Sequence, residues 1–470
     1  MLRTRAVWLL LSTVGITTAL AAQAPKLPAP PAPLPATEFA ERRAALVREL
    51  QKAEPGGKFV VLVRGNAGAT DMGAFVQDQD FLYLSGVAEP GLALLLGPGA
   101  NNGQGLDELL VPPHSRFAAT WDGDFLAPGE QSAKATGFAV CGNVRSLEER
   151  LAALLGADQD GKRPVLYTLV EAAPRIGSTP GKANGVAADM ANDKFDGRTS
   201  REQALVARCK ALYPGLEVKG LEGLLGTMRA HKSPGEIELL RNSARIAAEG
   251  IAESMKGTRP GLYEFQVAAV ARYVFSLRGA GPDAYAAIVG GGPNGCVLHY
   301  MKCTRQLLQD DLIVMDYAPT LQGYASDVTR TFPASGKFSP AQRKLVQDVY
   351  EIQQALIADV KPGARLSELG RKCQEMLKER GYRSDHGPCH HVGLAVHDPS
   401  IDELAAGMVI TVEPGAYLRD QGMGCRIEDT VLVTAKGQEV LSWNVPSAPD
   451  AIEALMRGKG VLDSKVGTGK

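Results

Sequence analysis

The sequence has no excess of charge of either sign. Its 51 lysine and arginine residues almost balance its 52 aspartate and glutamate residues, which leaves a formal net charge of -1 at pH 7. Nucleic acids and anionic membranes attract proteins through a basic field, so we expect no nucleic-acid partner. A small neutral or zwitterionic ligand is compatible with this composition.

The chain also lacks an uninterrupted apolar run of the roughly 20 residues that a membrane span needs. The apolar residues 6–11 follow Arg3 and Arg5, but serine, threonine and glycine interrupt the sequence after them. This start, with the small residues 19–24 behind it, is typical of an export signal. We therefore expect residues 1–24 to be a cleaved signal peptide, the protein to be periplasmic or secreted, and no stable membrane anchor to remain. Retention as an anchor is the alternative.

Cysteine is scarce and odd in number. Seven cysteines in an exported chain leave at least one thiol unpaired, and their spacing resembles neither a zinc site nor a disulfide framework. Free cysteines are most often small buried hydrophobic residues, and we expect that role here. Four of them lie close in sequence to the candidate site residues below: Cys296, Cys303, Cys389 and Cys425.

The length of 470 residues exceeds the usual size of one domain, so we expect two. Residues 25–36 form a proline-rich linker, because prolines favour an extended conformation over packing. We expect the N-terminal domain over residues 37–212 and the second domain over residues 213–456. The Gly- and Lys-rich residues 457–470 are expected to be a flexible tail.

Apolar patterns predict an α/β (α+β) fold. A helical pattern begins near Phe39, and the apolar runs 59–63, 81–84 and 92–96 have the length and composition of strands. The clearest helix start is at Ser233, which a proline follows and a glutamate three residues later completes as a capping box. This helix opens the second domain.

Two aspartates stand on adjacent strand-like segments of the second domain. Residues 312–317 read LIVMDY and residues 323–332 read GYASDVTRTF, with Pro319 in the turn between them. The pattern predicts a hairpin that places Asp316 and Asp327 on neighbouring strands, about 5 Å apart. Two ionised carboxylates that close repel unless one is protonated or a cation lies between them. The pair is therefore a candidate metal site, and a solvent-facing aspartate is the alternative.

Histidines cluster in one segment. Of the seven in the chain, four lie in residues 385–398, which read DHGPCHHVGLAVHD. Neutral imidazole is a metal ligand and a proton carrier, and the glycines and the proline permit a backbone that aims several rings at one place. His386, His390 and His397 are the candidates; a hydrogen-bonded loop histidine is the alternative for each.

Two glutamates interrupt apolar, strand-like runs. Glu413 ends one run before a Pro-Gly pair, and Glu428 follows Arg426 in another. A charged side chain in such a run needs a partner or a metal ion. Glu428 could also simply pair with Arg426, two residues away on the same strand face.

Taken in chain order, Asp316, Asp327, His390, Glu413 and Glu428 resemble the metal site of the pita-bread metallopeptidases. That family includes methionine aminopeptidase, aminopeptidase P and prolidase. The resemblance is closest to aminopeptidase P, and it covers roughly residues 213–456. It implies a C-terminal pita-bread catalytic domain.

Short motifs around these residues carry the resemblance. They are HY at 299–300, GYASDVTRTF at 323–332, HG at 386–387, VEPG at 412–415 and RIED at 426–429. The first domain is similar to the N-terminal, creatinase-like domain of the same family. That similarity rests on FLYLSGVAEP at 81–90 and WDG at 121–123.

The resemblance implies two divalent metal ions. Oxygen-rich donors suit Mn²⁺, and Zn²⁺ or Co²⁺ could occupy the same site. Asp327 and Glu428 would bridge both ions, Asp316 would hold one, and His390 and Glu413 would hold the other. A hydroxide that bridges the two ions would be the nucleophile.

The resemblance also implies roles for the other site residues. Glu413 would double as the proton shuttle to the leaving nitrogen. His299 and His397 match histidines that contact the substrate and stabilise the oxyanion, and His386 lines the same pocket. Arg426 would orient the carboxylates.

The implied reaction is hydrolysis of the N-terminal Xaa-Pro bond of peptides with proline in second position. The nearest alternative is an Xaa-Pro dipeptidase (prolidase), which would need a cationic group for the terminal carboxylate that the sequence does not locate. A third is a pita-bread protein without peptidase activity. The resemblance also implies a homo-oligomer, a dimer or a tetramer.

Overall fold

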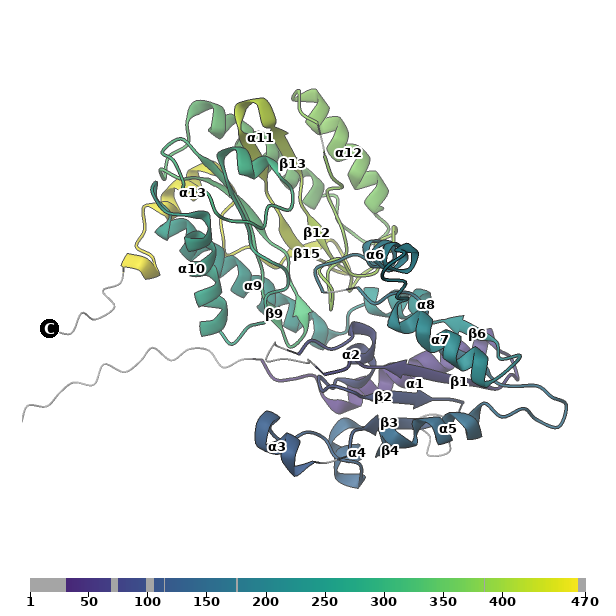
Figure 1. The fold of residues 1–470 in the computed structure, drawn as a ribbon. Helices are drawn as coiled ribbons and strands as arrows, with labels where there is room; N and C mark the ends of the chain where they lie inside the picture. Colours follow the sequence, from purple (N-terminus) through teal and green to yellow (C-terminus); the bar gives the residue numbers. More distant parts are fainter. Residues whose placement is uncertain are drawn as a thin grey trace, which may run out of the picture.

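The computed structural model describes residues 31–68, 75–98, 105–113, 115–174, 176–383 and 385–463. The predicted signal peptide lies outside the described residues, as do residues 25–30 of the predicted linker and residues 464–470 of the predicted tail. The chain folds into two α/β domains, with the N-terminal domain below the C-terminal domain in Figure 1. Within the described part, no helix combines the length and the apolar character that crossing a membrane requires.

A six-stranded mixed sheet forms the centre of the N-terminal domain, in the order β4-β3-β2-β1-β5-β6. Alternate residues of its central strand face opposite sides, so that Val61 and Val63 join one hydrophobic core while Val60 and Leu62 join another. The runs 59–63 and 92–96 are confirmed as strands. The strands are β1 (Phe59–Arg64), β2 (Ala93–Leu96), β3 (Asp107–Val111), β4 (Val140–Asn143), β5 (Val165–Thr168) and β6 (Val218–Gly220).

The run 81–84, predicted as a strand, is part of helix α2 (Gln79–Ser85) instead. The carboxylate of Asp78 caps the helix by accepting a hydrogen bond from the backbone nitrogen of Phe81 at 2.9 Å. Gly86 ends the helix in the left-handed conformation, with a φ of 68°. This prediction was wrong because an aspartate cap and a glycine stop at this spacing outweigh the strand propensity of a short apolar run.

The remaining helices of the N-terminal domain pack around its sheet or lie between it and the second domain. The predicted helix near Phe39 is α1, which packs against α2. Strand β6 pairs with β5 but lies beyond residue 212, so the N-terminal sheet extends past the expected domain boundary. The helices are α1 (Ala36–Ala53), α3 (Arg116–Asp122), α4 (Glu130–Thr136), α5 (Leu147–Leu154), α6 (Pro180–Asn192), α7 (Arg201–Leu212) and α8 (Glu222–Ala230), with the 3-10 turn η1 (Val144–Ser146).

Short antiparallel sheets form the centre of the C-terminal domain. Their orders are β11-β8-β7, β12-β15-β16, β13-β14 and β10-β9, and a backbone bridge between Thr329 and Glu428 joins the first two. The strands are β7 (Ile288–Gly291), β8 (Leu312–Asp316), β9 (Thr320–Leu321), β10 (Tyr324–Ala325), β11 (Thr329–Pro333), β12 (Val409–Val412), β13 (Gly415–Leu418), β14 (Met423–Arg426), β15 (Asp429–Val433) and β16 (Gln438–Val440).

Long helices pack on the outside of these sheets (Figure 1). The predicted capping box at Ser233 is confirmed, because its hydroxyl accepts from Glu236 N at 3.1 Å and the Glu236 carboxylate accepts from Ser233 N at 2.9 Å. The helices are α9 (Pro234–Gly257), α10 (Glu264–Leu277), α11 (Pro340–Ile357), α12 (Leu366–Glu379) and α13 (Pro449–Met456), with the 3-10 turns η2 (Gly292–Cys296), η3 (Arg419–Gln421) and η4 (Val461–Asp463).

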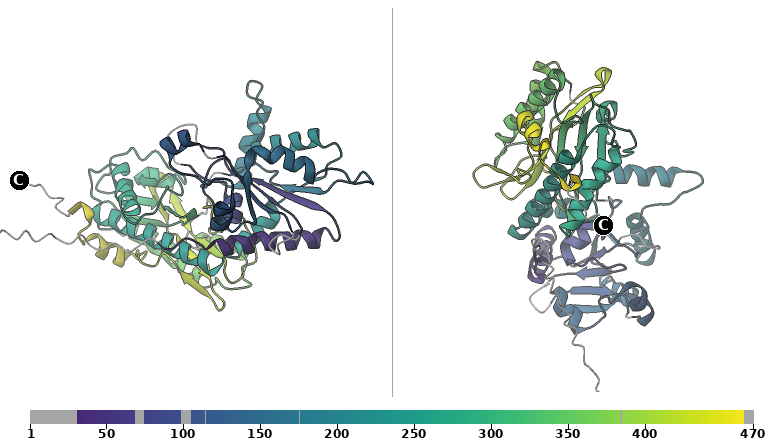
Figure 2. Two further views of the ribbon diagram at one scale, coloured as in Figure 1. Left: turned by 90° about the horizontal axis from the view of Figure 1, so that it is seen from below. Right: turned by 90° about the vertical axis from the view of Figure 1, so that its left-hand side faces the viewer.

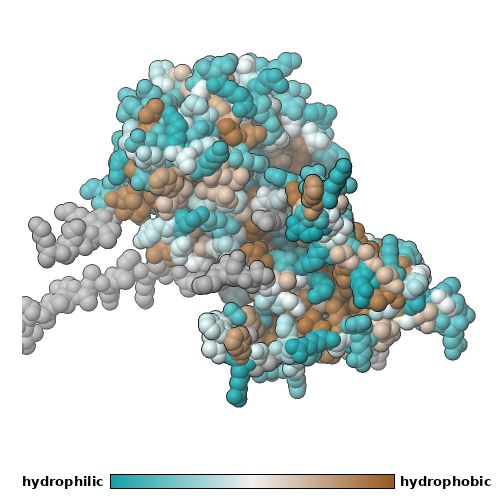
Figure 3. Space-filling model, viewed as in Figure 1, coloured by the Kyte–Doolittle hydropathy of each residue, from teal (hydrophilic) through white to brown (hydrophobic). Residues whose placement is uncertain are grey.

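The two domains meet along one side, and α6 lies beside the C-terminal domain rather than over its own sheet (Figures 1 and 2). Hydrophilic side chains cover much of the visible face of the C-terminal domain in Figure 3. The free cysteines of the described part are buried, apart from Cys389, which is partly exposed. This agrees with the expected role of cysteine as a small core residue.

Candidate metal centre

The fold brings the predicted metal ligands to the wall of one cavity of about 430 Å³. They come from separate elements: the end of β8, the segment before β11, the loop before β12, the position after β12, and the turn between β14 and β15. In that order they are Asp316, Asp327, His390, Glu413 and Glu428. The side chains of His299, His386, His397 and Arg426 line the same cavity.

Strand pairing explains the convergence. The predicted hairpin is present, because β8 pairs antiparallel with β11 and sets Asp316 opposite Thr329. Asp327 lies two residues before β11 rather than on it, so the prediction that both aspartates stand on paired strands was wrong for Asp327. The small β9-β10 ladder occupies the connection. Thr329 in turn bridges to Glu428, and β12 pairs with β15 so that Val412 stands opposite Asp429. Both glutamates are therefore held close to the aspartates.

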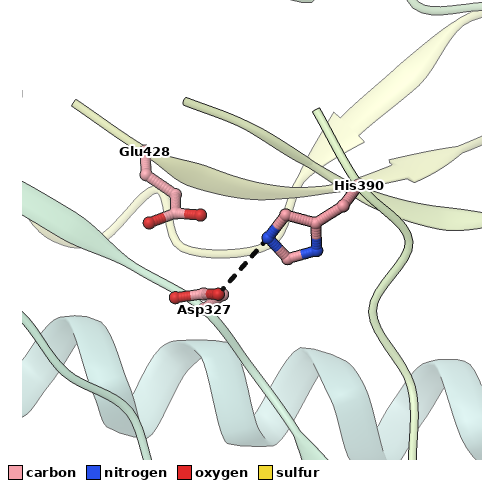
Figure 4. Close-up of side chains that lie close together, drawn as sticks. All are labelled: Asp327, His390 and Glu428. Atoms are coloured by element: carbon pink, nitrogen blue, oxygen red, sulfur yellow. Dashed lines mark ion pairs between the residues drawn. The ribbon is translucent and has the colours of Figure 1, made fainter. Parts of the chain in front are cut away.

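Three side chains point toward one another at the centre of the site (Figure 4). Asp327, His390 and Glu428 each offer one ligand atom, and these atoms all lie within 4.8 Å of one another. His390 Nε2 is 3.5 Å from Asp327 Oδ2 and 3.3 Å from Glu413 Oε1. This is the spacing of donors that can share one cation.

Burial makes the cluster unfavourable without a cation. Burial and the neighbouring Asp316 raise the pKa of Asp327 to about 7. Burial and Asp327 raise the pKa of Glu428 well above its usual range, and its Oε1 atom is buried without a hydrogen-bond partner among the described residues. Burial also acts to raise the pKa of Glu413, but its contact with His390 lowers that pKa to about 2. Negative charge and an unpaired acceptor in a buried site fit a divalent metal ion.

The contribution of Asp327 can be tested on metal-free protein by comparing wild type with Asp327→Asn. Because the pKa of Asp327 lies near 7 in the fold and near 3.8 ordinarily, wild-type stability falls as the pH rises through that window. The asparagine variant lacks this loss, so its melting temperature should rise relative to wild type between about pH 4 and about pH 7. Above about pH 7 the difference between the two proteins should stay constant.

The comparison is needed because other groups titrate in the same range. Burial lowers the pKa of His391 and of His397 to about 4, which makes stability rise with pH, in the opposite sense. Both histidines are shared by the two proteins, so their effect cancels in the difference. A difference in melting temperature that shrinks with rising pH would contradict the assignment.

Tyr285 is a site residue that the sequence did not reveal. Its hydroxyl lies 2.5 Å from Asp316 Oδ1 and 2.6 Å from Asp327 Oδ1. It precedes β7, and the pairing of β7 with β8 sets Ile288 opposite Asp316. A tyrosine in the apolar segment AYAAIV has no distinguishing pattern, so only the strand register could have found it.

The histidines surround Glu413 and His390. His386 Nδ1 is 3.6 Å from Glu413 Oε2, and its Nε2 is 2.9 Å from the hydroxyl of Tyr417. The rings of His390 and His397 lie 4.3 Å apart between centroids, and Nδ1 of His397 is buried with no partner among the described residues. These rings can carry protons and donate to a ligand.

Arg426 contacts an aspartate of the cluster rather than Glu428. Its Nη2 donates to Asp316 Oδ2 at 2.7 Å, and its Nη1 donates to the hydroxyl of Tyr417 at 3.0 Å. The ion pair with Glu428 that the sequence left open is therefore absent from the described contacts. The guanidinium holds Asp316 in one orientation.

Comparison with known proteins assigns the chain to a family. Residues 238–435 match metallopeptidase family M24, and residues 39–162 match the N-terminal domain of aminopeptidase P. The Xaa-Pro dipeptidase of Pyrococcus furiosus is 33% identical over 234 residues, which make up 48% of this chain and 67% of that protein. The chain belongs to metallopeptidase family M24.

Other members resemble this M24 chain over one or both domains. The Xaa-Pro aminopeptidase of Escherichia coli K12 is 35% identical over 263 residues, and the match spans 49% of this chain and 60% of that relative. The structure of E. coli aminopeptidase P with the inhibitor Pro-Leu has a TM-score of 0.74 and 27% identity, and covers 91% of this chain and 99% of that one. Membership of M24 implies divalent metal ions, and the donor set of the M24 chain suits them.

Proposed function

We propose that this protein is a metal-dependent Xaa-Pro aminopeptidase, which removes the N-terminal residue of peptides with proline in second position. The observation that carries the proposal is the buried carboxylate-histidine cluster at the base of a cavity that both domains line. The volume of that cavity, about 430 Å³, lies within the roughly 300–1,000 Å³ of typical small-ligand sites. The short peptides expected from the resemblance are ligands of that size.

In this proposal Asp316, Asp327, His390, Glu413 and Glu428 would hold the metal ions. Carboxylate oxygens and one imidazole suit Mn²⁺, and Zn²⁺ or Co²⁺ could replace it. Two such ions, when bound, would lower the pKa of a water molecule and polarise the scissile carbonyl.

The protein's own residues supply binding and proton transfer in this proposal. Glu413 lies beside His390 and can accept a proton from the attacking water and deliver it to the proline nitrogen. His299 and His397 line the cavity and can donate to the developing oxyanion, with His386 beside Glu413. Arg426 keeps Asp316 oriented.

Aminopeptidase activity is favoured over dipeptidase activity by the N-terminal domain. Residues 39–162 match the domain named for aminopeptidase P, and the E. coli aminopeptidase P structure covers 91% of this chain. The P. furiosus dipeptidase aligns with only 48% of it. Xaa-Pro dipeptidase activity remains the alternative.

The test uses the chain without residues 1–24, stripped of metal by a chelator and then supplied with Mn²⁺. We expect cleavage of Ala-Pro-Leu to alanine and Pro-Leu, with little turnover of Ala-Pro. The reverse preference would make the protein a dipeptidase. Release from neither peptide, with no metal retained, would refute the proposal.

Export to the periplasm or the medium and assembly into a dimer or tetramer are further parts of the proposal. The first rests on residues 1–24 and the second on the family resemblance. Fractionation of cells that express the full chain, and light scattering of the purified protein, test them separately.

A further inference from the structure

A segment of the N-terminal domain forms part of the wall of the candidate active site. Gly177, Ser178, Thr179 and Lys182 line the same cavity as the carboxylate cluster. They lie at the start of α6, which stands beside the C-terminal domain in Figures 1 and 2. Residues from two domains therefore surround whatever ligand the cavity holds.

Direct contacts fix this segment against the catalytic domain. The carbonyl of Ile176 accepts a hydrogen bond from Val396 N at 2.9 Å, next to His397. A Cβ atom on Gly177 would lie 3.1 Å from Tyr285 Cβ and 3.3 Å from the carbonyl of Ala284, so the two backbones are packed closely there. The hydroxyl of Tyr285 in turn contacts the two aspartates. The segment thus has a defined position over the site.

Charge is distributed unevenly in the cavity. The carboxylates of Asp316, Asp327 and Glu428 are buried at its base, while Lys182 is exposed. Arg426 also lines the cavity, but it is buried and paired with Asp316. In the part of the chain that the structure describes, the side chain of Lys182 makes no ion pair. Its ammonium group is therefore available to an anionic ligand.

We propose that Lys182 binds the C-terminal carboxylate of short peptide substrates. The inference rests on the proposed function, because it takes the cluster at the base as the site of cleavage. A short peptide is a zwitterion, and its amine is attracted to the acidic base while its carboxylate is attracted to the ammonium group at the exposed end. The site therefore favours short peptides with a free C-terminus over amidated or long ones.

Lys182 is a cationic group for the terminal carboxylate of the substrate, which the sequence did not locate. Lys182 belongs to the N-terminal domain and precedes the first proposed metal ligand, Asp316, by more than a hundred residues in the sequence. An ion pair at an exposed position changes binding by at most roughly fivefold, and we expect threefold to fivefold here. Salt weakens such a contact, because the Debye length falls from about 10 Å at 0.1 M to about 3 Å at 1 M.

The test measures kcat/KM of the Mn²⁺-loaded protein on Ala-Pro-Leu and on Ala-Pro-leucinamide. Wild type should prefer the free acid by about threefold to fivefold, Lys182→Ala should lose the preference, and Lys182→Glu should prefer the amide. The preference of wild type should shrink as salt is raised. Lys194→Ala is the matched control, because Lys194 is an exposed lysine just after the same helix and lies outside the cavity.

Equilibrium binding gives a second readout that does not depend on turnover. Calorimetry should show that Pro-Leu binds wild type more tightly than prolyl-leucinamide does, and that Lys182→Ala removes the difference. Lys182 could instead bind a side-chain carboxylate of the peptide. The kcat/KM values of Ala-Pro-Glu-amide and Ala-Pro-Gln-amide test this alternative. A preference for the glutamate peptide, without a preference for free acid over amide in the leucine peptides, would overturn the assignment to the C-terminus.

The failure of this inference can be told from failure of the proposed function. If wild type cleaves these peptides but Lys182→Ala keeps the same ratio of acid to amide, the role of Lys182 is refuted and the peptidase function stands. If wild type cleaves none of them, the proposed function falls and the role of Lys182 falls with it.

Discussion

Replacing Glu428 with glutamine is expected to abolish activity while leaving the fold intact. Glu428 is the most buried acid of the cluster, 1% exposed, and one oxygen, Oε2, accepts from Thr329 Oγ1 at 2.6 Å. An amide keeps the shape but removes the negative charge that a divalent ion needs. Metal content should drop, and kcat/KM should fall by more than the roughly 10- to 100-fold cost of losing an outer-shell contact. Metal analysis and peptide assays measure both.

The stability of the metal-free protein should not fall with activity in the Glu428→Gln variant. Burial and Asp327 raise the pKa of Glu428 well above its usual range, so ionised Glu428 is unfavourable in the metal-free protein at neutral pH. Glutamine removes that cost, and the metal-free variant should melt at the same temperature as wild type or higher. Glu439→Gln is the matched control, because Glu439 lies on β16, which pairs with the strand that follows Glu428, but its side chain is 42% exposed. A Glu428→Gln variant with full metal content and near-normal activity would refute the assignment.

Several candidate residues could be singled out from sequence because a charged side chain is costly in their places, and the resemblance to the pita-bread metallopeptidases then joined five of them into one ligand set. Glu413 and Glu428 stand in apolar runs, and Asp316 ends another, where an ionised group needs a partner. The two-residue periodicity of strands then placed them on segments that can pair. The structure brings these residues to one cavity, along with His390.

The rest of the site depends on contacts between segments far apart in sequence. Tyr285 reaches the aspartates only through the register of β7 on β8, and Lys182 reaches the cavity only through the packing of one domain on the other. Neither residue type is unusual where it stands. The run 81–84 is a different case, because its apolar residues favour a strand while Asp78 and Gly86 favour a helix start and a helix end. A sequence pattern reveals a residue whose local environment is unfavourable. Tyr285 and Lys182 are not in unfavourable local environments, so no pattern marks them.

The largest loss of stability is expected from Arg229→Ala. Arg229 is 4% exposed on α8, and its guanidinium joins the domains by donating to Asp80 Oδ1 at 2.8 Å and to Asp398 Oδ1 at 2.5 Å. Removing it leaves the buried carboxylate of Asp398 with Lys232 alone and takes the ion pair from the partly exposed Asp80, which costs about 3–5 kcal/mol. Burial acts to raise the pKa of Asp398, but Arg229 and Lys232 lower it below its usual value near 3.8. The stabilisation from the ion pair between Arg229 and Asp398 is therefore present at neutral pH and is lost only as the pH falls below about 4.

Denaturant unfolding at neutral pH measures this loss, and Arg241→Ala is the matched control. Arg241 also pairs with two carboxylates, those of Glu238 and Glu439, but its side chain is 36% exposed, so its removal should cost no more than about 1 kcal/mol. Since Asp398 directly follows His397 of the candidate site, folded Arg229→Ala protein should also cleave peptides more slowly. Equal losses from the two variants would show that the buried pair at the domain interface contributes no more than a surface one.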